Sequence, residues 1–129
     1  ASDVYKRQDF QREGNEDVRL AYNFAITLLG DRAFLDTIVL SLSATGGRGE
    51  RARGYIMELV PSIAPDLYPY LNDRDPGVRM ALAGILAEFG DPEAIDHLTP
   101  RLTDPEADVA DAANRAIQSL RRAAAYGGQ

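Results

Sequence analysis

The sequence predicts an all-α fold: an α-solenoid of about three and a half helical-hairpin repeats, with seven helices in a right-handed superhelical stack. Three observations support this prediction. Residues 71–102 contain two helix-start signals, Asp75-Pro76 and Asp91-Pro92, each followed by an apolar run with helical spacing. Similar segments recur about every 30 residues, as in repeat proteins. No segment alternates between apolar and polar residues as a half-buried strand would.

The helical pattern is clearest between Asp75 and Gly90. Aspartate is a favoured N-cap, and a proline that follows it loses only an amide hydrogen that has no partner within the helix. A glycine directly after the last apolar residue is a common C-terminal signal. The expected apolar face of this helix consists of Val78, Ala81, Leu82, Ile85, Leu86 and Phe89.

The same signals place the other helices and the domain limits. The expected helices span 17–30, 32–43, 50–60, 65–72, 76–89, 92–102 and 108–122. The repeat domain is expected at 16–122, between an artefactual or disordered segment, 1–15, and a tail that frays, 123–129. Within the segment 1–15, residues 2–8 (SDVYKRQ) resemble the translated read-through of a sequencing-library adapter. We therefore expect this chain to be a fragment of a larger protein.

The first expected helix differs from the others because no preceding helix is available as its hairpin partner. We expect its apolar surface to be bare and available for self-association. Its apolar face is expected to consist of Val18, Ala21, Ala25, Leu28 and Leu29. The inward residues of the other helices are expected to be Leu35, Ile38, Val39, Leu42, Ala52, Ile56, Leu59, Val60, Leu67, Leu71, Val109, Ala112, Ala113, Ala116, Ile117 and Leu120.

An internal repeat becomes visible when the second helix of each hairpin is superposed. The superposition aligns Ala21, Ala52, Ala81 and Ala112, at intervals of 31, 29 and 31 residues. In the first helices, Pro69 and Pro100 occupy equivalent positions, and a proline there predicts a kink. Helix-turn-helix units at a fixed period are typical of solenoids, in which each hairpin hides its apolar face against its neighbours.

The repeat resembles a HEAT repeat of the short bacterial type known as the phycobilisome-lyase HEAT-like repeat. The resemblance rests on the opening Leu-x-Asp-x-Asp-Pro-x-Val-Arg at 71–79 and on the link Gly-Asp-Pro-x-Ala-Ile at 90–95, and it extends loosely over 17–122. It implies that Arg19 and Arg79 pair with loop aspartates of adjacent repeats. Ala110 replaces this arginine in the last repeat, where we expect the ladder to be missing.

Composition excludes several functions. The chain has no cysteine, which rules out disulfides, thiolate metal sites and cysteine nucleophiles. Its 20 acidic and 14 basic residues give a net charge of −6, which disfavours general attraction to nucleic acids or anionic lipids. No apolar run is long enough to span a membrane.

Groups able to perform chemistry are few, and each also has a structural interpretation. His97 is the only histidine; it is either an acid-base residue or a partly exposed helix residue. The acidic pairs Asp73 with Asp75 and Asp104 with Glu106 indicate either a cation site or helix caps. The glycine-rich segment 46–51, with Arg48 and Arg51, indicates either a phosphate cradle or a flexible turn. We favour the structural interpretation in each case, and we expect no catalytic residue, cofactor or metal.

A binding surface is the better candidate. In HEAT-like solenoids the second helices line the concave face, and the register predicts which side chains project from it. The projecting columns are Leu20, Arg51, Met80 and Asp111; Asn23, Gly54, Ala83 and Asn114; Phe24, Tyr55, Gly84 and Arg115; and Thr27, Glu58, Ala87 and Gln118. The alternative is that these positions form only a solvated face. From them we predict the partner-binding residues Asn23, Phe24, Arg51, Tyr55, Glu58, Asn114 and Arg115.

The first functional hypothesis is a non-catalytic, cytoplasmic scaffold that binds a protein partner on its concave face. The alternative, implied by the family resemblance, is a bilin lyase-like or chaperone subunit that acts on a protein substrate. A third hypothesis, nucleic-acid binding of the HEAT-like DNA glycosylase kind, conflicts with the acidic charge balance. We therefore expect a protein partner, and neither nucleic acid nor membrane.

Overall fold

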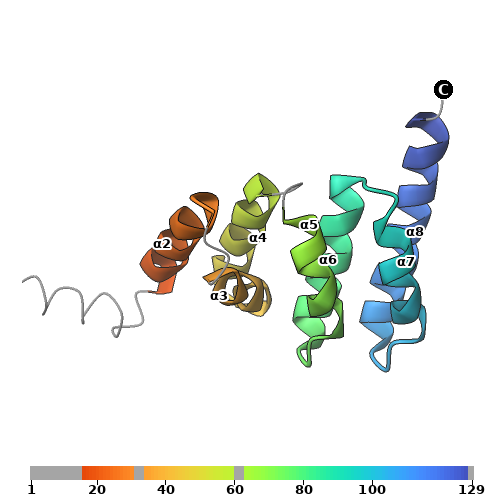
Figure 1. Cartoon of the computed structure of the whole chain (residues 1–129). Coiled ribbons are helices and arrows are strands. Elements are labelled where there is room, and N and C mark those ends of the chain that lie inside the picture. The colour runs from red at the N-terminus through yellow and green to blue at the C-terminus, as the bar shows by residue number, and fades with distance from the viewer. Residues whose placement is uncertain (1–15, 31–33, 60–62, 128–129) are drawn as a thin grey trace, which may run out of the picture. The chain divides into compact units, whose positions relative to one another are not determined.

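The computed structural model describes residues 16–30, 34–59 and 63–127, and within these ranges all regular secondary structure is helical (Figure 1). The described residues form seven α-helices, so the all-α prediction and the predicted helix order are confirmed for this part of the chain. The chain divides into two compact units, Ala1–Tyr55 and Ile56–Gln129. The handedness predicted for the stack stays a prediction.

The first unit contains α2 (Glu16–Leu28), α3 (Leu35–Leu40), the 3-10 helix η2 (Ser41–Ser43) and the beginning of α4 (Arg48–Leu59). Helix α4 begins two residues before its predicted start, directly after Gly46 and Gly47, whose φ angles of 69° and 86° turn the chain. The predicted starts and ends at 31–33 and 60–62 lie outside the described residues. Buried apolar residues of this unit are Leu20, Leu35, Ile38, Val39, Leu42 and Ala52.

Three of the projecting positions predicted on α2 are wrong. Leu20, Asn23 and Thr27 are buried, whereas Leu28 is exposed and Leu29 has 85% of its surface exposed. Val18 and Ala25, two other residues of the predicted apolar face, are also exposed. The physical reason is that α2 contacts α3 through one face, while no described helix covers its other apolar face. The expectation of a bare apolar surface on this helix is therefore confirmed for Val18, Ala25, Leu28 and Leu29.

The second unit contains two hairpins, in which the first helices lie on one side and the second helices on the other (Figure 1). The first hairpin consists of α5 (Ala64–Leu67), η3 (Tyr68–Asn72) and α6 (Pro76–Phe89). The second consists of α7 (Ala94–Leu98), η4 (Thr99–Thr103) and α8 (Ala107–Gly127). Helices α6 and α8 pack against each other. The core between the hairpins is built from Leu67, Leu71, Val78, Leu82, Ile85, Leu86, Leu98, Val109, Ala113, Ile117 and Leu120.

The predicted caps of α6 are present. The Asp75 side chain accepts a hydrogen bond of 2.8 Å from the Gly77 amide, which satisfies one of the amides left open at a helix start. Gly90 adopts the left-handed conformation, with φ 86°, and its amide donates to the Leu86 carbonyl at 3.1 Å. The residue types at both ends therefore act through the geometry that the sequence indicates.

The first helices change their geometry close to Pro69 and Pro100, where kinks are predicted. Both first helices change into a 3-10 helix one residue before the proline, at Tyr68 and Thr99. The first unit makes the same change to a 3-10 helix at Ser41, where there is no proline. The 3-10 turn is therefore a feature of the repeat that does not require proline.

Two helix boundaries also differ from prediction. Asp91-Pro92 forms a turn that leads into α7, which begins at Ala94, because the Asp91 side chain accepts from the Glu93 amide at 3.0 Å. Helix α8 extends to Gly127, past the predicted end at Arg122. Residues 123–125 are alanines, the best helix formers, and they outweigh the glycines that predicted a frayed tail at 123–129. Residues 128–129 lie outside the described residues.

Candidate functional site

The strongest polar cluster of the second unit is a buried ion pair. Arg79 Nε and Nη2 donate to the two carboxylate oxygens of Asp104, each at 2.9 Å. The Asp104 side chain is 0% exposed and that of Arg79 is 9% exposed. Arg101 Nη1 and the Glu106 amide also donate to Asp104, each at 2.9 Å. Arg79 Nη1 donates to the backbone carbonyl of Asp73 at 2.7 Å, so one guanidinium joins two repeats.

The environment of this pair shifts both protonation equilibria. The hydrogen bond from Arg79 holds the pKa of the Asp104 carboxyl below its ordinary value, although burial opposes this. The same bond raises the pKa of Arg79. Both groups are therefore held in their charged forms. The cluster connects repeats, and its carboxylate already has four donated hydrogen bonds.

The ladder predicted from the family resemblance is confirmed at Arg79 but not at Arg19. Among the described residues Arg19 has no ion-pair partner. Asp104 lies 25 residues after Arg79, and the residue at the same interval after Arg19 is Ala44, which has no carboxylate. In the last repeat, where the ladder is expected to be missing, Ala110 occupies the position of the arginine.

The other chemical candidates also occupy structural positions. The ring of His97 stacks on that of Tyr68, with centroids 3.7 Å apart and an angle of 8° between the planes. Asp73 accepts from the Asp75 amide at 2.9 Å, and Asp75 caps α6. Within the described ranges no group of three or more His, Cys, Asp or Glu residues is arranged to hold a metal ion.

The arginines of the glycine-rich segment contact an internal anion. Arg51 Nη2 lies 2.7 Å from Asp17 Oδ1, and Arg48 Nε lies 3.5 Å from the same oxygen. The hydrogen bond from Arg51 holds the pKa of Asp17 below its ordinary value. Because all three side chains are partly exposed to solvent, the pairs contribute little to stability. The chain itself therefore places a carboxylate beside these two arginines.

Four of the predicted binding residues belong to the first unit, and they are not all at the surface. Phe24 and Tyr55 stack with ring centroids 4.4 Å apart at 17°, and both are partly buried. Arg51 is exposed and pairs with Asp17. Asn23 is only 6% exposed, and its carbonyl accepts from the Thr27 hydroxyl. Asn23 is predicted to project from an open face, and this is wrong because Asn23 lies on the buried side of α2.

The first unit also has a small hollow between α2 and the beginning of α3. It encloses about 250 Å³ and is lined by Arg19, Tyr22, Asn23, Phe34 and Thr37. The register of the second helices gave no indication of it, because Phe34 and Thr37 belong to a first helix.

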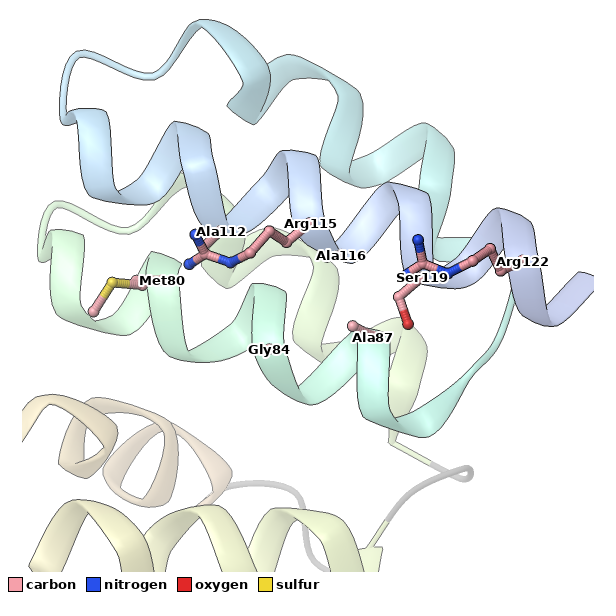
Figure 2. A pocket seen from close by; sticks show the side chains of 8 residues that line it. All are labelled: Met80, Gly84, Ala87, Ala112, Arg115, Ala116, Ser119 and Arg122. Carbon is pink, nitrogen blue, oxygen red and sulfur yellow. The ribbon is translucent and has the colours of Figure 1, made fainter.

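The second unit carries a larger groove of about 410 Å³ between α6 and α8 (Figure 2). Met80, Gly84 and Ala87 line it from α6, at positions of the predicted projecting columns. Helix α8 contributes Ala112, Arg115, Ala116, Ser119 and Arg122. The register therefore identified the α6 side of the groove and Arg115.

The remaining predicted residues lie outside this groove. Asn114 is exposed on α8, and its Oδ1 accepts from Gln118 Nε2 at 3.3 Å. Glu58 is exposed on α4. Ala83, in the same column as Asn114, is buried. A column position therefore does not guarantee exposure in every repeat.

Sequence reasoning missed Ser119 and Arg122. Arg122 lies seven residues after Arg115, so both are on the same face of α8 by helical periodicity. Extending the predicted column by two turns would have found it. Among the described residues neither arginine has an ion-pair partner, and no carboxylate lines the groove.

Comparisons with known proteins agree with this architecture. The family model described as HEAT repeats matches residues 49–125. No curated protein and no solved structure matches the chain. In the described part of the chain, no helix has the length and apolar character needed to cross a membrane.

Proposed function

Because the chain belongs to the HEAT-repeat family, we propose that it is a non-catalytic scaffold that binds another protein through the exposed face of its second helices. HEAT repeats generally mediate protein–protein interaction. In the second unit the contact surface would be the groove between α6 and α8. In the first unit it would include the Phe24–Tyr55 stack and Arg51.

The groove between α6 and α8 is the observation on which the proposal depends. Its volume of about 410 Å³ is within the range of ligand-binding clefts, and its floor consists of small side chains. Met80 at one end is 42% exposed. Methionine and arginine are both enriched at protein interfaces, and the groove contains both.

The chemistry of the polar side chains also favours binding over catalysis. Asp104 is buried beneath Arg79 and Arg101, and His97 stacks on Tyr68. None of these groups lines the groove. The lyase-like alternative rests on the family resemblance alone, because nothing in the groove is specific for a bilin.

A second contact surface is supported by α2. Val18, Tyr22 and Leu29 are exposed, and with Ala25 they recur at intervals of four, three and four residues. This spacing places them in one stripe, as in the seam of a coiled coil. We propose that the stripe pairs with a second copy of this chain.

A peptide-display experiment tests the groove. Random peptides long enough for about four helical turns are selected on the full chain and then measured on Gly84→Leu. A Cβ at Gly84 meets no atom within 4 Å, so leucine fills the groove without straining the helix. Ala107→Leu is the control, because Ala107 is also an exposed helical position, does not line the groove and is not one of the projecting columns.

The proposal expects selected peptides that bind the wild-type chain and Ala107→Leu but not Gly84→Leu. Selection that yields no peptide, or only peptides that bind Gly84→Leu as well as wild type, would reject the groove as a protein-binding surface.

A further inference from the structure

We infer that the occupant of the groove between α6 and α8 is an acidic amphipathic helix, whose carboxylates two turns apart contact Arg115 and Arg122. This inference rests on the proposed function and narrows the partner to one chemistry. The mode of binding is a helix laid in a groove, with apolar anchors on its inner face.

The local charge of the groove is opposite to that of the chain. The chain has 20 acidic and 14 basic residues, yet the groove is lined by two arginines and no carboxylate. Both arginines are exposed and without an ion-pair partner among the described residues. A partner with negative charges at this place would gain attraction here, although the net charge of the whole chain is −6.

The spacing of the arginines matches a helical partner. Seven residues along α8 correspond to two turns, or about 10.5 Å along the helix axis. Figure 2 shows both arginine side chains extending from α8 towards its N-terminal end, with Ser119 between them and directed towards α6. Glutamates seven residues apart on a partner helix repeat this distance and can meet both guanidinium groups.

The floor between the arginines suits an apolar contact. Gly84, Ala87 and Ala116 have small or no side chains, so a partner helix can approach the backbone closely. Met80 lies at the far end of the groove from Arg122 (Figure 2) and offers a flexible apolar contact. The complementary partner therefore has apolar residues in the turns between its two carboxylates.

Nucleic acid is a poorer fit to the same arginines. A phosphate backbone needs a continuous basic track, whereas two arginines stand here on a chain of net charge −6. Single strands also need aromatic rings for base stacking, and no aromatic residue lines the groove.

The experiment uses the peptides that bind the wild-type chain and are blocked by Gly84→Leu. Each is sequenced, and its affinity is measured by fluorescence anisotropy on wild type, Arg115→Gln, Arg122→Gln and the double variant, at low and high salt. Arg121→Gln is the matched control, because Arg121 is an exposed arginine on the same helix that does not line the groove. A duplex DNA oligonucleotide is measured in parallel.

We expect these peptides to contain Asp or Glu pairs about seven residues apart. Affinity should fall about threefold for each single variant and about tenfold for the double variant, with smaller losses at high salt. Arg121→Gln should bind as wild type does. Groove-dependent peptides without acidic pairs, or equal affinity for the double variant, would overturn the inference while leaving the proposed function intact. Tighter binding of the DNA, lost in the double variant, would also overturn it.

Discussion

The ion pair between Arg79 and Asp104 allows the sharpest test of how these repeats are held together. Asp104→Ala removes a carboxylate that accepts hydrogen bonds from two nitrogens of Arg79, from Arg101 and from the Glu106 amide. The guanidinium of Arg79 then stays largely buried. Its remaining acceptors are the backbone carbonyls of Asp73 and Arg74, at 2.7 and 3.2 Å.

The expected cost follows from the charge that is left behind. Removing one partner of a buried pair lowers the free energy of unfolding by about 3–5 kcal/mol, because the other charge loses its compensation. Since Arg79 is 9% exposed and keeps two carbonyls, we expect the lower end, about 3 kcal/mol. This is a large fraction of the roughly 5–15 kcal/mol that stabilises an ordinary domain.

The reverse deletion should cost less. In Arg79→Leu the carboxylate of Asp104 keeps a cation, Arg101, and the Glu106 amide, so we expect about 2 kcal/mol. The double variant should be more stable than the sum of the single effects predicts, with a coupling of about 2 kcal/mol between the two sites.

The assay is urea unfolding followed by far-ultraviolet circular dichroism, with hydrogen exchange of the amides of α6 and α8 as a local readout, because repeat proteins can open in parts. Asp96→Ala is the control, since Asp96 is an exposed aspartate on α7 and should change the free energy by no more than about 0.5 kcal/mol. If Asp104→Ala were no more destabilising than Asp96→Ala, the pair would not hold the repeats together.

Three further predictions follow. Gly90→Ala should lower the free energy of unfolding by about 1 kcal/mol, because φ is 86° there. Gly84→Ala, at an exposed position of α6, should raise it by up to about 1 kcal/mol, and thermal melts compare the two variants. Because the pKa of Asp104 is lowered from its ordinary value of 3.8, its carboxylate stabilises the folded state above that pH. This stability is lost as the pH falls through the pKa of the folded state. In acid titrations, wild type should therefore lose stability below about pH 4 more steeply than Asp104→Asn. Leu29→Glu should shift the chain towards monomer in light scattering if the α2 stripe pairs two copies, and an unchanged mass for an oligomeric wild type would reject this.

The sequence predicted the second unit well because its signals are local and mutually consistent. Asp75 and Gly90 cap α6 as expected, and the apolar stripe of α8 is buried from Val109 to Leu120. The two hairpins pack on each other there, so their facing apolar positions meet the surface that the repeat assumes. What the sequence could not show is where a helix changes to 3-10 geometry, since η2 does so without a proline.

The errors at α2 have one physical cause. The register treated Leu20, Asn23 and Thr27 as projecting because equivalent positions project elsewhere, yet they are buried. A column assigns the direction of a side chain only relative to its own helix, and burial depends on which neighbours that helix has. Without a described helix on its other face, α2 buries the side turned to α3 and exposes the apolar stripe.

This dependence on neighbours also explains where the candidate site lies. The arginine that recurs in the repeat is buried at Arg79, because the loop residue Asp104, 25 positions later, pairs with it and neutralises its charge. Helix α8 has Ala110 at that position, and its groove arginines, Arg115 and Arg122, are exposed. The two kinds of arginine therefore differ in what can neutralise them: an internal aspartate for the first, and an external partner for the second. A charge-reversing change at Arg115 should consequently weaken binding of the partner and leave the free energy of unfolding nearly unchanged. The same change at Arg79 should lower the free energy of unfolding, and it removes no group that lines the groove.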